Sequence, residues 1–279
     1  MMIQKSYDGN STLYLIPTPI GNLEDITIRG LNTLKTVDFI LCEDTRVTSI
    51  LLNRYGIKKI LIRCDEYSQE KVKNKVLSAL NEGKNIGLVS DAGSPIISDP
   101  GYIISQYVLD AGFNVVALPG ATAFVPALSV SGLDSHAFYF YGFLDSKPSK
   151  VKKQLQKLKS KEETLIFYES PHHLISTLNL MLSIFGDRNI AICREISKIH
   201  EEVFRGRITQ CIKELDNVKG EFVIVVEGNK DEVDFSDLDI ISHVDLYVND
   251  GMSKMDAIKV VAKERKVSKS IIYKEYNRK

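Results

Sequence analysis

Short hydrophobic runs alternate with helical patterns over roughly the first half of the chain. The runs are bounded by turn-forming residues, as buried strands of a parallel sheet are. The predicted strands are 13–16, 39–42, 60–62, 86–89 and 115–118. Apolar residues at helical spacing follow each run, for example at 28–34 and 48–55. This alternation predicts a mostly parallel sheet with helices on both faces.

The pattern changes near Ser135, where an aromatic-rich, strand-like run (137–144) precedes a lysine-rich helical stretch. Further predicted elements are strands at 164–168, 190–193 and 222–226 and a helix at 173–184. We interpret these as a second α/β domain with its own sheet. The predicted domain boundaries are therefore 1–134 and 135–229.

A third part of the chain is predicted to be helical. Residues 229–239 are acidic and lack a periodic apolar pattern, which is typical of a linker. Apolar positions at helical spacing then flank a short break at Val267-Ser268. Within the predicted segment 236–279, this is a helix-turn-helix outline, and a helical pair capping the second domain is the alternative.

The charges are balanced overall but unevenly distributed. The formal net charge is zero, yet residues 252–279 hold nine Lys/Arg against three Asp/Glu, so the remainder carries −6. Residues 147–161 add seven lysines and no acid. Each basic run could be a solvated helix face or a contact with an anionic partner.

The cysteines and hydropathy indicate the compartment. Cys42, Cys64, Cys193 and Cys211 form no Cys-x-x-Cys pair and lie in or beside apolar stretches, which favours buried free thiols in a reducing environment. The polar amino-terminus does not resemble a signal peptide, and no apolar run approaches the ~18 residues of a membrane span. We expect a cytoplasmic protein without a membrane partner.

Common cofactor motifs are absent from the sequence. It contains neither the Gly-x-Gly-x-x-Gly dinucleotide fingerprint nor a P-loop. The five histidines do not have metal-ligand spacing, and the neighbours His172 and His173 would point to different sides of a helix. No metal site is expected.

Loops rich in Gly, Pro and polar residues follow four predicted strands, at 17–25, 43–46, 87–101 and 118–123. The carboxyl ends of parallel strands meet at one sheet edge, where open α/β folds bind ligands. The loops therefore predict a site for a small polar molecule. Within them, Glu43, Asp44 and Arg46 are either a helix cap with a local ion pair or part of that site.

Taken together, these loops and two later motifs resemble the ribosomal RNA small subunit methyltransferase I family. The resemblance rests on Leu13–Arg29, Glu43–Arg46, Ser90–Gly101, Leu118–Ala123, Tyr168–His172 and Gly220–Gly228. It implies two α/β domains of the tetrapyrrole methylase type, with S-adenosylmethionine in a cleft between them. It also implies 2′-O-methylation of a cytidine in the decoding region of 16S ribosomal RNA, within the small ribosomal subunit, by a homodimer.

Carried over by position, the resemblance assigns residues to the cofactor. These are Pro19, Asp91, Gly93, Ser94, Ile97, Thr122 and Ala123. Asp91 and Asp99 are expected to orient the cofactor or the loop rather than to catalyse. Two positions depart from the family: Cys64–Glu70 replaces a His-Glu-x-Asn-Glu-like stretch, and Ser94 stands where Thr is common.

Positioning of the reactants can lower the barrier of such a transfer by ~7–11 kcal/mol. A general base typically adds ~10²–10⁴-fold in rate, which corresponds to only about 3–5 kcal/mol. We expect Glu43 or Asp44 to accept or direct the hydroxyl proton, and Arg46 and Arg29 to hold phosphates. The stretch with Lys150, Lys152 and Lys153, together with the basic tail, is expected to contact the RNA backbone. The alternatives are a tetrapyrrole or other small-molecule methyltransferase of the same fold and a non-catalytic RNA-binding relative.

Overall fold

The computed structural model describes residues 4–6, 9–215, 219–230 and 238–278. The chain divides into one unit of residues 1–229 and a second of residues 230–279. Most of the predicted acidic linker, and the first two residues of the predicted segment 236–279, lie outside the described residues.

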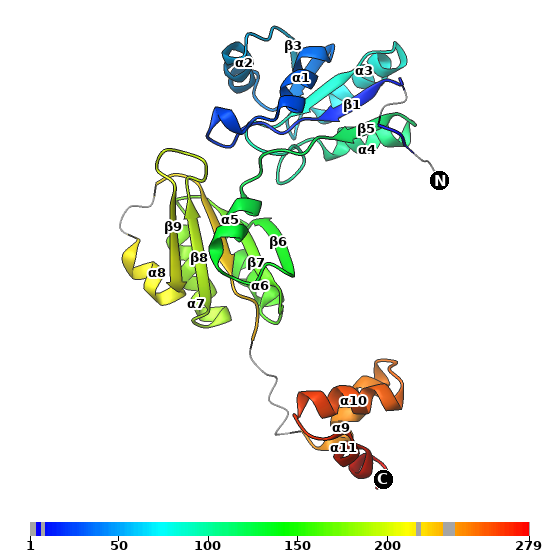
Figure 1. The fold of residues 1–279 in the computed structure, drawn as a ribbon, viewed down its shortest axis with the longest axis vertical. Helices are drawn as coiled ribbons and strands as arrows, with labels where there is room; N and C mark the ends of the chain where they lie inside the picture. The colour runs from blue at the N-terminus through cyan, green and yellow to red at the C-terminus, as the bar shows by residue number, and fades with distance from the viewer. Residues whose placement is uncertain (1–3, 7–8, 216–218, 231–237, 279) are drawn as a thin grey trace. The chain divides into compact units, whose positions relative to one another are not determined.

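The first sheet is entirely parallel and has the strand order β3-β2-β4-β1-β5 (Figure 1). Its strands are β1 (Thr12–Leu15), β2 (Phe39–Cys42), β3 (Ile60–Arg63), β4 (Ile86–Val89) and β5 (Asn114–Ala117). All five predicted strands of this region are confirmed within one residue at each end. Because β4 lies between β1 and β2, the loops that follow these three strands leave the sheet side by side.

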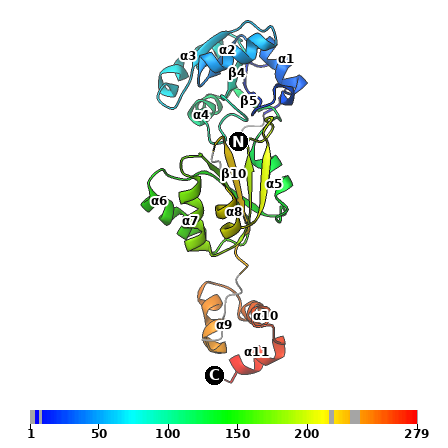
Figure 2. The same cartoon turned by 90° about the vertical axis from the view of Figure 1, so that its left-hand side faces the viewer.

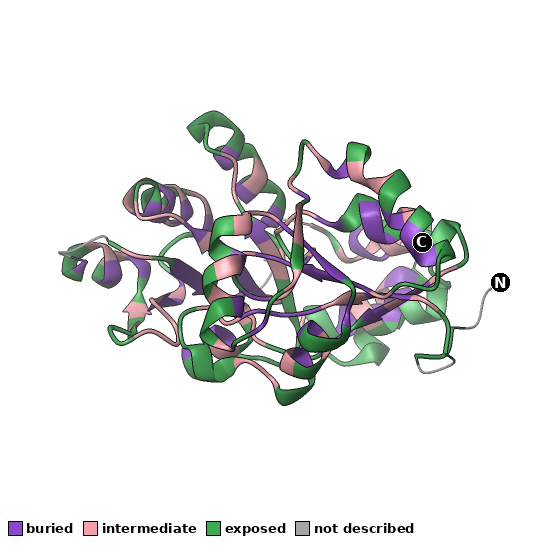
Figure 3. Cartoon of the chain, turned by 90° about the horizontal axis from the view of Figure 1, so that it is seen from above, coloured by how far each residue is buried: buried purple, intermediate pink, exposed green. Residues whose placement is uncertain are grey.

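Helices cover both faces of this sheet. They are α1 (Ile28–Thr36), α2 (Thr45–Arg54), α3 (Gln69–Asn81) and α4 (Tyr102–Asp110), with a 3₁₀ turn, η1 (Leu23–Asp25), ahead of α1. Successive side chains of a strand point to opposite faces of the sheet. In β2, Phe39 and Leu41 pack with α3 and α4, whereas Ile40 and Cys42 pack with α1 and α2. The buried strands appear purple between largely green helix surfaces in Figure 3.

The second sheet is mixed and has the order β6-β7-β10-β8-β9, with its outer strands labelled in Figure 1 and its central strand β10 in Figure 2. Its strands are β6 (Phe138–Phe143), β7 (Thr164–Glu169), β8 (Asn189–Arg194), β9 (Glu202–Arg207) and β10 (Phe222–Val226). Only β6 and β7 run parallel, and the other neighbours are antiparallel. The sequence did not predict β9, an edge strand whose charged residues form no hydrophobic run.

Helices α6 (Pro148–Leu158), α7 (Leu174–Phe185) and α8 (Ile208–Glu214) pack on one face of the second sheet. Helix α5 (Phe124–Ser131) packs on the other face, where Ala127 and Leu128 contact its buried strand residues. By packing, α5 belongs with the second sheet, although it precedes the predicted boundary at 134/135.

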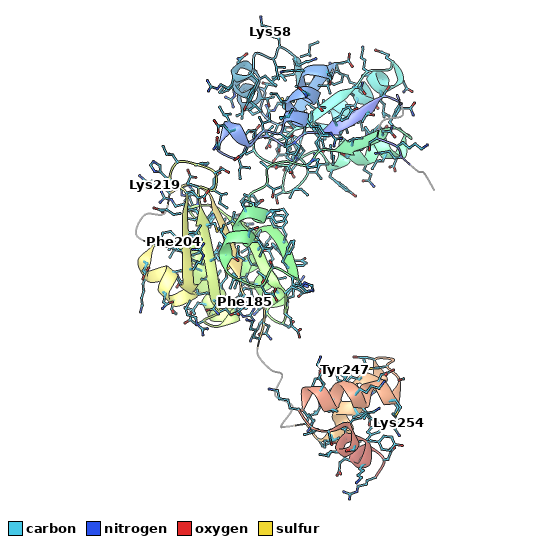
Figure 4. All side chains as sticks on the ribbon, viewed as in Figure 1. Lys58, Phe185, Phe204, Lys219, Tyr247 and Lys254 are labelled. Carbon is cyan, nitrogen blue, oxygen red and sulfur yellow. The ribbon has the colours of Figure 1, made fainter. Side chains whose placement is uncertain are left out.

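The carboxy-terminal unit is a three-helix bundle with its own core. It comprises α9 (Ile240–Asn249), α10 (Lys254–Glu264) and α11 (Lys269–Tyr276). Val244, Ile258, Val261 and Ile272 are fully buried among these helices. The amino group of Lys254, a residue labelled in Figure 4, lies over the ring of Tyr276. The turn between α10 and α11 agrees with the predicted break, whereas α9 was not predicted.

All four cysteines are free and buried, as predicted, and burial raises the pKa of each thiol. Within the described residues, no helix is long and apolar enough to cross a bilayer.

Candidate functional site

The loops after the strands of the first sheet open onto a cavity of about 480 Å³, which we call the main cavity. Its lining also includes residues from the second sheet, so both α/β parts of the 1–229 unit contribute. The lining residues are Ile20, Glu43, Asp91–Ser94, Ile97–Asp99, Thr122, Ala123, Phe143, Tyr168–Pro171, Ile196 and Glu221–Val223.

The loop after β4 is held in place by the loop after β1. Thr18 and Gly93 exchange two backbone hydrogen bonds of 2.9 and 3.0 Å, and the Thr18 hydroxyl donates to the Ser90 carbonyl at 3.1 Å. Gly93 adopts φ +85°, and a Cβ there would lie 3.3 Å from Cγ2 of Ile20. Only glycine takes this conformation without strain and leaves the backbone open to the cavity.

The same loop contains two strained residues. Ile96 and Ser98 have φ of 76° and 67°, a region that costs a non-glycine residue about 1–3 kcal/mol. The surrounding structure must stabilise them. Part of that support comes from the stretch that departs from the family, because the buried Gln69 accepts a hydrogen bond of 3.0 Å from the Gly101 N–H.

Five carboxylates line the main cavity, and three of them, Glu43, Asp91 and Asp99, come from the loops of the first sheet. Burial, with Glu43 and Asp91 nearby, raises the pKa of Asp99 to about 7. Burial likewise raises the pKa of Glu43, and the charge of Asp91 adds to the effect. Like charges that share a poorly solvated site disfavour one another's ionised forms. The cavity is therefore suited to a cationic ligand, which would relieve that repulsion.

Asp44 and Arg46 form a local structure beside the main cavity. Asp44 caps α2 by accepting from the Arg46 N–H at 2.8 Å, and its carboxylate also accepts from the Arg46 side chain at 2.6–3.1 Å. These hydrogen bonds lower the pKa of Asp44 to about 2. Neither residue lines the main cavity, so their geometry is that of the predicted cap and ion pair. Among the predicted catalytic residues, Glu43 alone lines it.

The predicted cofactor residues lie around the main cavity, with one exception. Asp91, Gly93, Ser94, Ile97, Thr122 and Ala123 all line it. Pro19 instead lines a second cavity of about 280 Å³, which we call the side cavity. The side cavity is bounded by Thr18, Pro19, Gly21, Leu23, Val47, Thr48, Ile50, Leu51, Arg54, Ser90 and Asp91.

The predicted RNA-binding residues lie away from both cavities. Arg29 is exposed on α1. In α6, Val151, Leu155 and Leu158 are buried, which leaves Lys150, Lys152 and Lys153 exposed on the other side. Lys150 pairs with Asp145 at 2.9 Å. This arrangement fits a solvated helix face and an RNA contact equally well.

Individual sequence positions did not predict the second sheet's part of the lining. Residues 168–171 span the end of β7 and residues 221–223 span the start of β10, and the antiparallel register pairs Glu169 with Phe222. Both stretches lie within motifs that carried the family resemblance. Membership of these motifs was the signal by which the sequence could have assigned them to the site. Their proximity was not predictable from local patterns, because the paired residues are more than fifty positions apart.

Glu169 has a structural role at this end of β7. Its carboxylate accepts from the Ser170 N–H at 2.8 Å and from the Thr177 hydroxyl at 2.7 Å, which ties β7 to α7.

Among the described residues, no group of His, Cys, Asp or Glu is arranged to hold a metal ion.

Comparisons with known proteins place this fold in a family. Residues 12–212 match the model of the Tetrapyrrole (Corrin/Porphyrin) Methylases. The uroporphyrin-III-C-methyltransferase of Thermus thermophilus has a TM-score of 0.57 at 20% identity and covers 78% of this chain and 94% of its own. The methyltransferase CobJ has a TM-score of 0.59 at 18% identity, with 78% and 94% covered. At such identities the structures support the fold alone.

Two curated relatives are much closer in sequence, and both are named ribosomal RNA small subunit methyltransferase I. The Bacillus subtilis (strain 168) relative is 46% identical over 285 residues, with 98% of each chain covered. The Thermotoga maritima relative is 44% identical over 220 residues, which cover 99% of its own length and 78% of this chain. The chain therefore belongs to the ribosomal RNA small subunit methyltransferase I family of tetrapyrrole methylases.

Proposed function

We propose that this protein uses S-adenosylmethionine to methylate the 2′-hydroxyl of a cytidine in the decoding region of 16S ribosomal RNA, within the small ribosomal subunit. The observation that carries the proposal is the similarity, at 39–46% identity over nearly the full chain, to relatives named for this subunit's RNA. A bacterial ribosomal substrate implies a cytoplasmic location. The homodimer stays a prediction from the resemblance.

The charge of the main cavity fits this cofactor. S-adenosylmethionine carries positive charge on its sulfonium and on its amino group. Glu43, Asp91 and Asp99 supply carboxylates around the same cavity, and the pKa of Asp99 is raised to about 7. Opposite charges within about 4–6 Å favour the ionised forms, so a bound cation would stabilise these carboxylates.

The shape and polar groups of the main cavity support the same assignment. Gly93 keeps the backbone accessible, and the hydroxyl oxygen of Thr122 is buried without a hydrogen-bond partner among the described residues. An unpaired buried hydroxyl is costly, and a ligand would relieve that cost. Asp91, Gly93, Ser94, Ile97, Thr122 and Ala123 would hold the cofactor.

The protein's own contribution to the reaction is to position the acceptor and to handle its proton. When bound, the cofactor supplies a methyl group that leaves a positively charged sulfur as the acceptor oxygen bonds to it. Glu43 would accept the proton of the attacking hydroxyl. A carboxylate whose pKa is raised toward the working pH is a stronger base than an ordinary one.

Cofactor affinity is expected to decrease as the pH falls below about 7, because Asp99 then carries a proton. A bound cation lowers the pKa of this group, so binding below pH 7 releases a proton from Asp99. The affinity should therefore fall by at most about tenfold for each unit by which the pH is lowered. Calorimetric titration of S-adenosylmethionine in buffers of different ionisation enthalpy measures both effects. Asp99→Asn should remove the pH dependence, whereas Asp110→Asn, on the exposed end of α4, should retain it. Affinity of the unaltered protein that does not change with pH would contradict this prediction.

The α6 lysines are expected to bind RNA phosphates. Replacing Lys152 and Lys153 by Gln should then weaken binding to small subunits and reduce the slope of log affinity against log salt by about one for each phosphate that the variant no longer binds. The matched control replaces the exposed Lys71 and Lys75 of α3 by Gln. Equal slopes for the two double variants would show that α6 is only a solvated helix face.

Transfer of tritiated methyl from S-adenosylmethionine tests the proposed function. The acceptors are isolated small subunits from a strain lacking this protein, naked 16S RNA and a porphyrin precursor. We expect label in the subunits, recovered as 2′-O-methylcytidine. Label in the precursor would favour the small-molecule methyltransferase. Binding of subunits without transfer to any acceptor would favour the non-catalytic relative.

A further inference from the structure

The side cavity adjoins the main cavity through shared walls. Asp91 lines both cavities, and in the loop after β1 the consecutive residues Pro19 and Ile20 line the side and main cavities respectively. A ligand in the side cavity would therefore contact the same short loops as one in the main cavity. Two reactants that exchange a methyl group must meet in this way, because the reacting atoms need to approach within about 3–3.5 Å.

The walls of the side cavity suit a flat, partly polar group. Leu23, Val47, Ile50 and Leu51 present aliphatic surface, and the 3₁₀ turn that carries Leu23 is fixed by a hydrogen bond of 2.5 Å from the Tyr55 hydroxyl. Small, mostly apolar cavities with a few placed polar groups are typical of specific binding sites. A nucleobase taken out of its stack is held in such a cavity by contacts to its faces and hydrogen bonds to its edge.

A buried polar group of the side cavity has only a weak partner, the Cys42 thiol. The Thr48 side chain is only 2% exposed, and its hydroxyl makes no hydrogen bond to a nitrogen or oxygen of the described residues, with the weakly accepting Cys42 thiol as its neighbour. A hydroxyl buried in this way is stabilised by a ligand that can hydrogen-bond to it.

Two charged residues line the side cavity, Asp91 where it adjoins the main cavity and Arg54, and the positive charge of Arg54 favours a nucleotide phosphate. Arg54 lines it and makes no ion pair within the described part of the chain, so its guanidinium remains available for a phosphate. The volume of about 280 Å³ accommodates one nucleoside rather than a macrocycle of four pyrrole rings. The cavity thus matches one unit of an RNA chain.

We propose that the side cavity receives the acceptor ribonucleoside, turned out of its stack, with Val47 and Leu51 against the base, Thr48 at its polar edge and Arg54 on the adjacent phosphate. The assignment rests on the proposed function, since it takes the main cavity as the cofactor site. It also explains why Pro19, predicted to contact the cofactor, lines the side cavity.

Binding is tested with cytidine 5′-monophosphate as the probe. The protein is labelled at its Ile, Leu and Val methyl groups, and its methyl NMR spectrum is recorded in the presence of S-adenosylhomocysteine. Titration should shift the methyl signals of Leu23, Val47, Ile50 and Leu51, and should leave that of the exposed Leu109 on α4 unchanged. Shifts confined to methyl groups of the main cavity, such as Ile97, or absent altogether would overturn the assignment.

A variant that fills the side cavity provides the second test. Val47 is 41% exposed, so Val47→Trp can add bulk over the cavity without disturbing the core, and Leu109→Trp, at a position 45% exposed, is the matched control. Val47→Trp should reduce kcat/KM for small subunits by roughly 100-fold, the penalty of a misplaced reacting group, with cofactor affinity unchanged. Equal activity of the two variants would contradict the assignment, as would a loss of cofactor affinity that matches the loss of activity.

These measurements separate the inference from the proposed function. If the unaltered protein methylates no RNA but the probe shifts the side-cavity methyl signals, the proposed function fails and the nucleoside site stands. If RNA is methylated and neither test gives the expected result, the nucleoside site fails and the proposed function stands.

Discussion

Replacing Glu43 by Gln is expected to lower kcat for methyl transfer to small subunits by about 10²–10⁴-fold, the usual contribution of a general base. The amide keeps the size of the side chain but cannot accept the proton of the attacking hydroxyl at neutral pH. Because burial and Asp91 raise the pKa of Glu43, kcat of the unaltered enzyme should also decrease at acid pH as this carboxylate becomes protonated. Single-turnover rates across pH measure both effects.

Asp44→Ala is the contrasting variant, because Asp44 is the neighbouring candidate base. Its carboxylate is already engaged by the α2 amino-terminus and by Arg46. We therefore expect this variant to reduce the thermal stability of the protein while changing kcat much less than Glu43→Gln does. A larger loss of kcat in the Asp44 variant would reassign the base, and near-normal turnover in both variants would exclude a carboxylate base from this loop.

Enlarging the side chain at Gly93 is expected to weaken cofactor binding. Gly93 has φ +85°, and its Cβ position faces Ile20 and the Ala121 carbonyl at 3.3 and 3.6 Å. Gly93→Ala and Gly93→Val should therefore reduce cofactor affinity progressively, by about 5- to 150-fold, which corresponds to the ~1–3 kcal/mol that extra bulk costs in a filled site. Calorimetry of S-adenosylmethionine binding measures the change.

Gly112 provides the matched control for backbone strain. It has φ +84° in the turn after α4, with nothing within 4 Å of its Cβ position, and it lines neither cavity. Side chains in this region cost about 1–2 kcal/mol wherever they occur. The same substitutions at Gly112 should therefore lower stability while preserving cofactor affinity. If both positions lose affinity in parallel, the effect at Gly93 arises from strain and not from occupation of the main cavity.

The first sheet and its ligand edge could be predicted from sequence because both depend on local patterns. Buried parallel strands are hydrophobic runs, and each ends at a loop whose Gly, Pro and polar residues are visible in the sequence. The loops after β1, β2 and β4 then converge because β4 lies between the other two strands. Consequently Asp91, Gly93, Ser94 and Thr122, predicted to share a site, do line one cavity.

The remaining features of the site depend on packing, which local patterns do not encode. Strand β9 lies at a sheet edge and alternates exposed charged residues with partly buried ones, so its sequence contains no hydrophobic run from which a strand could be predicted. The raised pKa of Asp99 arises from burial beside Glu43, two residues more than fifty positions apart in the chain. The division of Pro19 and Ile20 between two cavities depends on where adjacent side chains point. Each of these properties requires the three-dimensional arrangement.

The most direct test of this account is a crystal structure of the protein with S-adenosylhomocysteine. The roles proposed for Glu43 and for the side cavity both require the cofactor to occupy the main cavity. We expect density there, in contact with Asp91, Gly93 and Thr122, and a side cavity left free for the acceptor. Cofactor density in the side cavity, against Val47, Leu51 and Arg54, would contradict it.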